Sequence, residues 1–247
     1  DNMGQVVARR FAAEGARVVV AGRSEAPLAE LAAELGGAHA LCDITRKAEV
    51  EALADFAQSK YGKVDVAMNC VGWAPLVKLL ETSEETMDKL AAVQFKGPHF
   101  FFQAFCARMA KTGGGSLITV SSASVYALLY HHAAYIATKA ASDALVRCFA
   151  NEFGAKGIKV NSIAPGLTES PMTERDMNTP GLLDLFRKEY PLGRIGTSED
   201  IANAALWLAG EESFVTGQVL QVNGGLTLRR NPNPWEISAA MKAAQAK

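Results

Sequence analysis

Tyr135 and Lys139 stand four residues apart in the stretch HHAAYIATKAASDAL, which has the apolar spacing of a helix. Residues at this spacing lie one turn apart on the same helical face, so we expect the phenol and the ammonium to be neighbours. A free phenol has a pKa of about 10, and a nearby cation lowers that value because it favours the phenolate. The pair therefore predicts a general acid and base near neutral pH, although an isolated Tyr-x-x-x-Lys would indicate only an ordinary helix surface.

Ser122 supplies a second hydroxyl shortly before Tyr135. It ends the run GSLITVSS, which we expect to form a strand, and the helix that carries Tyr135 follows that strand directly. In open parallel α/β sheets, ligands gather beyond the carboxyl ends of the strands. The two hydroxyls and the Lys139 ammonium are thus predicted to converge at one sheet edge, where they would hold and protonate a substrate oxygen.

Short apolar runs alternate with amphipathic helical patterns along the whole chain. Such alternation predicts a parallel sheet that helices cover on both faces, which is an α/β, doubly wound fold in a single domain. Thr82 and Glu85 have the spacing of a capping box at the start of one helix. The expected strands cover residues 15–22, 38–44, 64–72, 115–124, 157–166 and 217–225.

The first residues are unusual for such a sheet. Residues 5–14 have a helical pattern, and no strand pattern precedes them. A doubly wound fold begins with a strand and a glycine-rich turn before this helix. We therefore expect the sequence to lack its first strand and turn, about 10–20 residues. A natural chain with one strand fewer is the alternative.

Composition and charge limit the kinds of partner. The chain has 247 residues, 49% of them apolar, and a formal net charge of −1, which gives no reason to expect nucleic acid or an anionic membrane. No apolar run is long enough to span a bilayer. Four cysteines without a C-x-x-C pair predict free thiols and a cytoplasmic protein. The histidines are dispersed or adjacent, so we expect no metal site.

Eight short motifs resemble, in order and spacing, those of the short-chain dehydrogenase/reductase family in its classical type. They extend to about Gly225 and comprise DNMG, AGR, CDIT, NCVG, VSS, YIATK, VNSIAPG and TGQVLQVNGG. The resemblance implies a Rossmann-type domain that moves hydride between a nicotinamide cofactor and a carbonyl or alcohol carbon. In the family pattern, Ser122 orients the carbonyl and Tyr135 passes the proton. Lys139 lowers the tyrosine pKa and binds the nicotinamide ribose.

The same resemblance assigns cofactor contacts along the predicted carboxyl edge. DNMG matches the end of the family's glycine-rich turn, TGxxxGIG, and places Gly4 at a helix N-terminus that favours the pyrophosphate. The other implied contacts are Asn2, Met3, Arg23, Ser24, Asp43, Ile44, Asn69, Cys70, Gly72, Tyr135, Lys139, Pro165, Gly166, Thr168 and Ser170.

Cofactor choice depends on the residues that follow the strand at 15–22. Enzymes of this fold that use NAD(H) tend to place an acid there to bind the ribose 2′-hydroxyl. Here Gly22 is followed by Arg23 and Ser24, so no carboxylate repels a 2′-phosphate and an arginine stands ready to bind it. The sequence favours NADP(H) over NAD(H), with a solvated surface arginine as the alternative reading of Arg23.

Two positions depart from the family pattern. Asn2 replaces the middle glycine of the turn, and asparagine tolerates left-handed backbone better than most residues. Gln94 stands where the family has an asparagine that holds a water in a proton relay. Glutamine carries the same amide on a longer stem, so the relay is either displaced or rebuilt. Gln94 stays a candidate fourth catalytic residue.

The substrate is expected to meet a lid at about 168–195 that is rich in apolar residues. This composition favours a bulky apolar or aromatic ketone or secondary alcohol over a sugar, unless the lid residues simply pack on the core. Residues 1–230 form the expected Rossmann domain, and 231–247 form a C-terminal extension that would cover a neighbouring subunit or the substrate mouth. The family is commonly homotetrameric or homodimeric. The candidate substrate contacts are Trp73, Ser124, Tyr130 and Met172.

Three functions compete on these grounds. The first is an NADP(H)-dependent ketone reductase or alcohol dehydrogenase for a bulky apolar small molecule. The second, 3-oxoacyl reduction on an acyl carrier, would need a basic docking patch, which the scattered lysines and arginines neither predict nor exclude. The third is a non-catalytic dinucleotide-binding sensor, which Asn2 and Gln94 suggest. The intact Ser122, Tyr135 and Lys139 argue against a sensor.

Overall fold

The structure, a computed structural model, describes residues 2–170, 173 and 178–245. Its strands within that range all pair in parallel and form two sheets. One sheet joins β1 (Val19–Gly22) to β2 (Ala38–Leu41). The other has the order β3 (Val66–Asn69), β4 (Gly115–Val120), β5 (Ile158–Pro165) and β6 (Val219–Val222). The predicted α/β fold with a parallel sheet is confirmed, and a helix precedes the first of these strands as expected.

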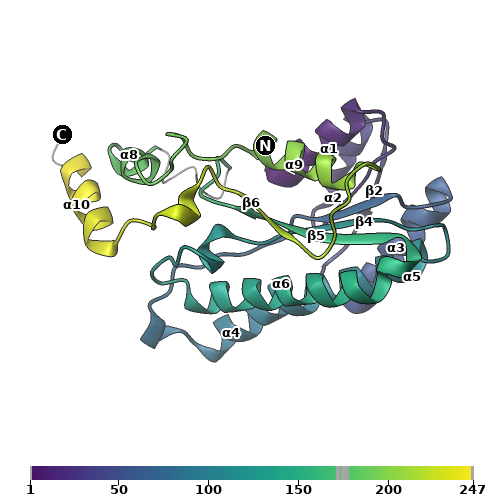
Figure 1. Cartoon of the computed structure of the whole chain (residues 1–247), viewed down its shortest axis with the longest axis horizontal. Helices are drawn as coiled ribbons and strands as arrows, with labels where there is room; N and C mark the ends of the chain where they lie inside the picture. The colour runs from purple at the N-terminus through teal and green to yellow at the C-terminus, as the bar shows by residue number, and fades with distance from the viewer. Residues whose placement is uncertain (1, 171–172, 174–177, 246–247) are drawn as a thin grey trace.

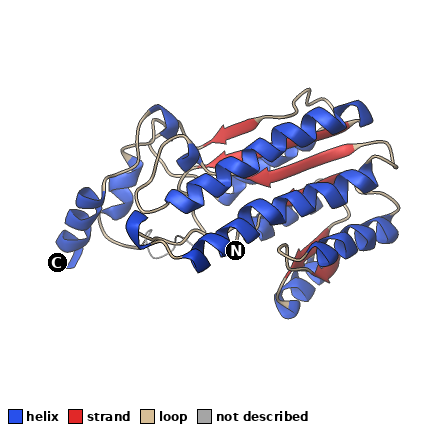
Figure 2. Ribbon diagram, turned by 90° about the horizontal axis from the view of Figure 1, so that it is seen from below, coloured by secondary structure: helices blue, strands red, loops and turns tan. Residues whose placement is uncertain are grey.

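Helices cover both faces of the larger sheet (Figures 1 and 2). In Figure 1, α4 and α6 lie on one face and α1 and α9 lie on the other. The described helices are α1 (Met3–Ala13), α2 (Glu25–Glu34), α3 (Lys47–Tyr61), α4 (Glu84–Ala91), α5 (Gly97–Met109), α6 (Ala133–Phe153), α8 (Leu182–Arg187), α9 (Ser198–Ala209) and α10 (Pro234–Gln245). None of the helices in this part of the chain is long and apolar enough to cross a membrane.

Alternation along the central strands divides the core into two layers. Successive side chains of a strand point to opposite faces, so Leu117 and Ile118 of β4 enter different clusters. Leu117 packs with the phenylalanines of α5, among them Phe102, which is fully buried. Ile118 packs with Ile201 of α9 on the opposite face. Because both faces are buried, these strands are continuously apolar, and their register is well determined.

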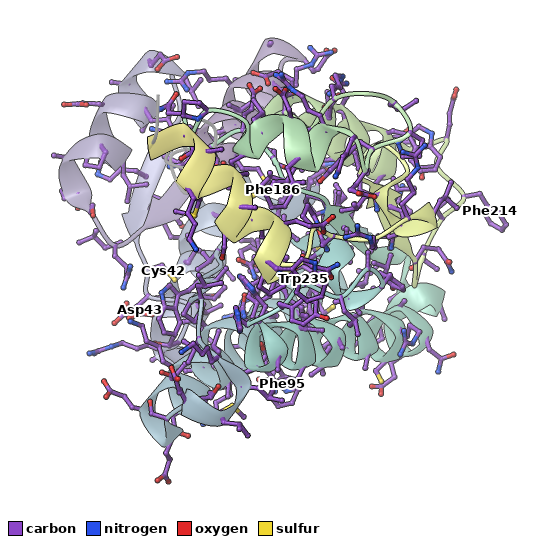
Figure 3. All side chains as sticks on the ribbon, turned by 90° about the vertical axis from the view of Figure 1, so that its left-hand side faces the viewer. Cys42, Asp43, Phe95, Phe186, Phe214 and Trp235 are labelled. Carbon is purple, nitrogen blue, oxygen red and sulfur yellow. The ribbon has the colours of Figure 1, made fainter. Side chains whose placement is uncertain are left out.

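The carboxyl ends of the strands face α8 and α10. The arrowheads in Figure 2 point towards the end of the molecule where these helices lie, and Figure 3 looks onto that end. The predicted lid contains α8, whose Leu182 and Phe186 pack against Ala123 and Ala127 beyond β4. The helix that follows the Asn-Pro pairs begins at Pro234 and contacts α8.

The predicted capping box at Thr82 is wrong. Ser83 is the residue that caps α4, and its hydroxyl accepts from the backbone of Thr86 at 3.2 Å. The Thr82 hydroxyl instead donates to the carbonyl of Lys78 at 3.3 Å. Ser and Thr both serve as caps, so spacing alone did not distinguish two adjacent hydroxyl residues.

Gly114 allows the loop before β4 to approach the loop before β5. Its φ is +102°, and a Cβ at this position would overlap the carbonyl oxygen of Gly157. We therefore expect Gly114→Ala to lower the free energy of unfolding by at least about 2 kcal/mol, measured by urea denaturation. Gly154→Ala is the matched control, because Gly154 has φ −56° and nothing within 4 Å of a Cβ. A Gly114→Ala protein as stable as the wild type would contradict this account.

Candidate active site

Helix α6 places three polar side chains along one buried face. Tyr135, Lys139 and Asp143 follow one another at four-residue intervals, and Lys139 is only 5% exposed. The Lys139 Nζ donates to the carbonyl oxygen of Val120, the last residue of β4, at 2.6 Å. The same Nζ lies 5.9 Å from the centroid of the Tyr135 ring. The end of β4 and this helix face therefore bring the phenol and the amine into one site.

Ser122 lies against Tyr135 on the strand side of the site. A hydrogen bond with the Ser122 hydroxyl acts to lower the pKa of Tyr135. The Ser122 hydroxyl is in turn within 2.8 Å of the Ser124 hydroxyl and accepts from the Ser124 backbone at 3.2 Å. Ser124 thus orients the Ser122 hydroxyl. The hydroxyls of Ser122 and Tyr135, the two candidate catalytic hydroxyls, are hydrogen-bonded to each other.

Burial dominates the acid–base properties of the pair. It raises the pKa of Tyr135 above the usual value, with the Ser122 hydrogen bond opposing the rise. It also lowers the pKa of Lys139 to about 8, with the charge of Asp143 opposing the fall. The sequence argument expected a net lowering of the tyrosine pKa, and this geometry does not have one. Burial thus separates two pKa values that are similar in the free side chains, because it disfavours the charged form of each group.

Gln94 lies near the same amine but on a separate element. It lies in η2 (Ala92–Lys96), a π-helical turn between α4 and α5, and it is 1% exposed. Its Nε2 donates to the Thr138 hydroxyl at 3.0 Å, while its Oε1 has no hydrogen-bond partner among the described residues. A Cβ on Gly72 would lie 3.7 Å from the Lys139 Nζ and 3.8 Å from this Oε1. A buried, unpaired acceptor and an ammonium therefore border the same space beside Gly72, an arrangement that fits a bound hydroxyl or water.

The N-terminus of α1 opens at the carboxyl edge of the sheet. Asn2 caps the helix, because its Oδ1 accepts from the Gln5 backbone at 3.0 Å and the Gln5 Oε1 accepts from the Asn2 backbone at 2.8 Å. Its backbone is extended, with φ −88°, so the left-handed conformation suggested for Asn2 is not used. A Cβ on Gly4 would lie 3.7 Å from the Cβ of Cys70. The first turn leaves the backbone N–H groups of Met3 and Gly4 outside the capping box, which fits an anionic group.

The ends of β1 and β2 bring the expected adenosine contacts together. Arg23 and Ser24 follow β1, and Asp43 and Ile44 follow β2, its neighbour. The Asp43 carboxylate accepts from the backbone and hydroxyl of Thr45 at 2.9 and 2.7 Å, and these bonds, with a smaller effect of Arg23, lower its pKa. Ile44 is buried in the core, whereas Asp43 is visible at this edge in Figure 3.

The remaining expected cofactor residues shape the loops after β3 and β5. Asn69 accepts from the backbone of Val71 at 2.9 Å, and burial raises the pKa of Cys70 to about 12, so the thiol is protonated. Gly166 follows Pro165, and a Cβ on Gly166 would overlap the Tyr190 hydroxyl. Two hydroxyl residues continue this segment: Thr168 donates to the carbonyl of Gly166 at 3.0 Å, and Ser170 lies 3.2 Å from the Thr173 hydroxyl.

Only some of the expected substrate contacts lie near the catalytic residues. Trp73 lies near α4, where the Lys89 Nζ stands 4.1 Å from its ring centroid. Tyr130 is half exposed, and its ring lies 6.2 Å from that of Trp235 on α10. Met172 lies outside the described residues. Sequence reasoning missed Asp143, although a third polar residue at helical spacing after Lys139 was a usable signal.

The hydroxyls of Ser122 and Tyr135 can together hold a carbonyl or hydroxyl oxygen of a substrate, next to the Lys139 ammonium. No group of three or more potential metal ligands occurs in the part of the chain that the structure describes. A proton can pass between such an oxygen and the phenol, while the buried ammonium stabilises negative charge. These groups accept and donate protons but do not themselves carry a hydride, so a redox reaction here needs a bound cofactor.

Residues 1–227 match the model of a family described as enoyl-(acyl carrier protein) reductase. The 7alpha-hydroxysteroid dehydrogenase of Escherichia coli strain K12 is 36% identical, over 90% of this chain and 89% of that protein. The structure of a short-chain type dehydrogenase/reductase from Mycobacterium ulcerans superposes with a TM-score of 0.91 at 31% identity, covering 98% of this chain and 90% of that one.

A third similar protein was solved with ligands. It is a gluconate 5-dehydrogenase from Burkholderia cenocepacia J2315 in complex with NADP and tartrate, with a TM-score of 0.88, 29% identity and 92% of each chain covered. These similarities cover nearly the whole length of the chain, and they agree with the parallel α/β fold and with the polar groups at its carboxyl edge. The chain belongs to the short-chain dehydrogenase/reductase family and is an NAD(P)-dependent oxidoreductase that acts on alcohol or carbonyl groups.

Proposed function

We propose that this protein transfers hydride between NADP(H) and a bulky apolar or aromatic ketone, or the corresponding secondary alcohol. The observation that carries the proposal is the meeting of Ser122, Tyr135 and the buried Lys139 at the carboxyl edge of the sheet. We further propose that the protein acts as a homotetramer or homodimer, as is common in the family.

Ser122, Tyr135 and Lys139 have different roles in the reaction of the substrate oxygen. In the reductive direction, Ser122 donates a hydrogen bond to the substrate carbonyl, and Tyr135 gives its phenolic proton to the same oxygen as negative charge develops there. Lys139 stabilises the resulting phenolate and binds a ribose hydroxyl. The reduced nicotinamide supplies the hydride when it is bound. In the oxidative direction, Tyr135 accepts the hydroxyl proton.

Gln94 supports the exchange of that proton with solvent. Its unpaired Oε1 and the Lys139 Nζ both border the space beside Gly72, so one water in that space would hydrogen bond to both. In this proposal the glutamine takes the place of the family's asparagine and rebuilds the relay through a longer side chain. Burying the Gln94 Oε1 without a hydrogen-bond donor costs free energy. This cost supports a functional role for the amide.

Arg23 and the absence of an acid after β1 support NADP(H). The Asp43 carboxylate on the adjacent strand end is occupied by two hydrogen bonds from Thr45. A ribose 2′-phosphate placed here would meet the Arg23 guanidinium, which binds phosphate through paired donors. The gluconate 5-dehydrogenase solved with NADP gives independent support from a similar fold.

Apolar side chains at the mouth support a bulky substrate. Leu128, Tyr130 and Trp235 are at least half exposed beside the site, and apolar groups of this size favour an apolar ligand. The similarity to a hydroxysteroid dehydrogenase supports the same class, since its substrate is a large alicyclic alcohol. The family description also names an acyl-carrier reductase, which keeps acyl thioesters as the second candidate.

Replacement of Tyr135 by phenylalanine tests the proton transfer. We expect Tyr135→Phe to lower kcat for ketone reduction by at least about 100-fold, because the variant removes the only proton that the proposal gives to the substrate oxygen. NADPH binding, followed by fluorescence titration, should stay within about twofold. Tyr61→Phe is the control, because Tyr61 ends α3 and its ring lies under the Arg17 guanidinium instead. Undiminished turnover by Tyr135→Phe would contradict the assignment.

Replacement of Arg23 by alanine tests the cofactor choice. We expect the KM for NADPH to rise by about tenfold, equivalent to about 1.4 kcal/mol, while the KM for NADH changes by less than about twofold. Steady-state rates with each cofactor measure both values. Arg17→Ala serves as the control for loss of a surface arginine, because Arg17 contacts Tyr61 instead. Equal effects on the two cofactors would argue against a 2′-phosphate site.

A substrate panel tests the apolar pocket. We expect kcat/KM with NADPH to be at least about tenfold higher for bicyclic or aryl ketones than for open-chain ketoses, because burying the extra apolar area favours the larger substrate. A 3-oxoacyl thioester belongs in the same panel. If the ketose or the thioester were preferred, the substrate class proposed here would be wrong.

A further inference from the structure

Asp143 is a buried carboxylate to which the reaction described above gives no role. It lies on α6 four residues after Lys139 and is 3% exposed. Its Oδ2 accepts from the Ser121 hydroxyl at 2.8 Å, and its Oδ1 has no hydrogen-bond partner among the described residues. Buried carboxylates are uncommon unless they are paired, because the loss of hydration is costly. The position therefore calls for a compensating interaction.

Three consecutive residues, from the last residue of β4 onward, contact three successive turns of α6. Val120 accepts from the Lys139 amine, Ser121 donates to Asp143, and Ser122 hydrogen bonds with Tyr135. Figure 1 shows α6 running along the sheet beneath these strands. The hydrogen bond of Asp143 is thus one of three that join the end of β4 and the residues after it to α6.

The groups around Asp143 favour its ionised form. Burial raises its pKa, and the hydroxyls of Ser121 and Ser162 act against that rise together with the cations of Lys139 and Arg147. From the segment after β4, Tyr126 also faces it, because the charge of Asp143 contributes to the raised pKa of that phenol. Two cations and two hydroxyls therefore oppose the effect of burial on the carboxylate.

We propose that Asp143 is a positioning residue that keeps the Lys139 amine cationic beside Tyr135. The inference rests on the proposed function, because the cation matters only if Tyr135 exchanges a proton. Lys139 is buried, and its single protein hydrogen bond in the described structure goes to the Val120 carbonyl, a neutral group. The carboxylate one turn further along the same helical face is the charge that does most to favour the protonated amine. A charged partner at this spacing stabilises an ammonium that would otherwise lose its proton on burial.

The sign of the effect follows from the surroundings of Lys139. Burial lowers the pKa of Lys139 to about 8, and the charge of Asp143 is the main effect that opposes the lowering, with a smaller contribution from Cys70. Removal of the carboxylate charge therefore lowers this pKa further. The amine would remain protonated at pH 6 and would be largely neutral at pH 8. A neutral amine does not stabilise the Tyr135 phenolate, so alcohol oxidation suffers most at the higher pH.

The first test compares kcat/KM for alcohol oxidation in the wild type and in Asp143→Asn from pH 6 to pH 9. We expect the ratio of wild type to variant to be below about threefold at pH 6, at least about fivefold at pH 8 and close to tenfold at pH 9, since one unit of pKa changes the protonated fraction up to tenfold above both pKa values. Ser121→Ala is the matched control, because it removes the hydrogen bond but leaves the charge, and its ratio should not vary with pH. A pH-independent ratio for Asp143→Asn would indicate a purely structural role and overturn the proposal.

The second test measures the Lys139 pKa without any assay of activity. In protein labelled with ¹³C at the lysine Cε, the Lys139 resonance is assigned by its absence in Lys139→Met, and its shift is followed with pH. We expect a midpoint near the value of about 8 in the wild type and at least about one unit lower in Asp143→Asn. Asp143→Ser is a second neutral variant should the asparagine protein fail to fold. An unchanged midpoint overturns the proposal, whereas a shifted midpoint in a protein that reduces no ketone refutes only the proposed function.

Discussion

The burial of one ammonium at the end of β4 is the constraint on which the site depends. Lys139 Nζ bonds the Val120 carbonyl at 2.6 Å in a place that water hardly reaches. Charge in such a place is costly unless hydrogen bonds and counter-charge compensate, so the helix has little freedom to rotate or slide. With that face of α6 held against the strand, Tyr135 is carried to Ser122. The same burial lowers the pKa of the amine to about 8, within the range in which the site would work.

Close backbone packing organises the rest of the carboxyl edge. Gly166 accommodates the buried Tyr190 ring, and Gly72 lies beside space that borders the Lys139 Nζ and the Gln94 Oε1. The Tyr190 hydroxyl accepts from the backbone of Leu167 at 2.6 Å, which ties the segment after β5 to the start of the lid. The absence of a side chain at Gly166 thus permits close packing, whereas at Gly72 it leaves space beside the buried amine.

Much of the fold was predictable because its signals are local. Alternating apolar runs located the strands, and both faces of β4 are buried as a continuous apolar strand requires. Details that depend on competition between neighbouring groups were not predictable. Ser83 rather than Thr82 caps α4, and Asn2 acts through its side chain as a helix cap and not through a left-handed backbone. In each case two conformations suit the residue type, and the packing of the helix end selects one of them.

By itself the sequence determined that a phenol, an amine and a hydroxyl would share one edge of a parallel α/β sheet, since helical spacing and strand order are properties of the chain. Only the tertiary structure decided how deeply these groups are buried and how their pKa values shift. Burial raises the pKa of Tyr135, contrary to the expectation from spacing, and the unpaired Gln94 oxygen comes near the amine from η2, a separate element. The reason is physical: proximity on one helix follows from its pitch, whereas desolvation depends on every segment packed around it.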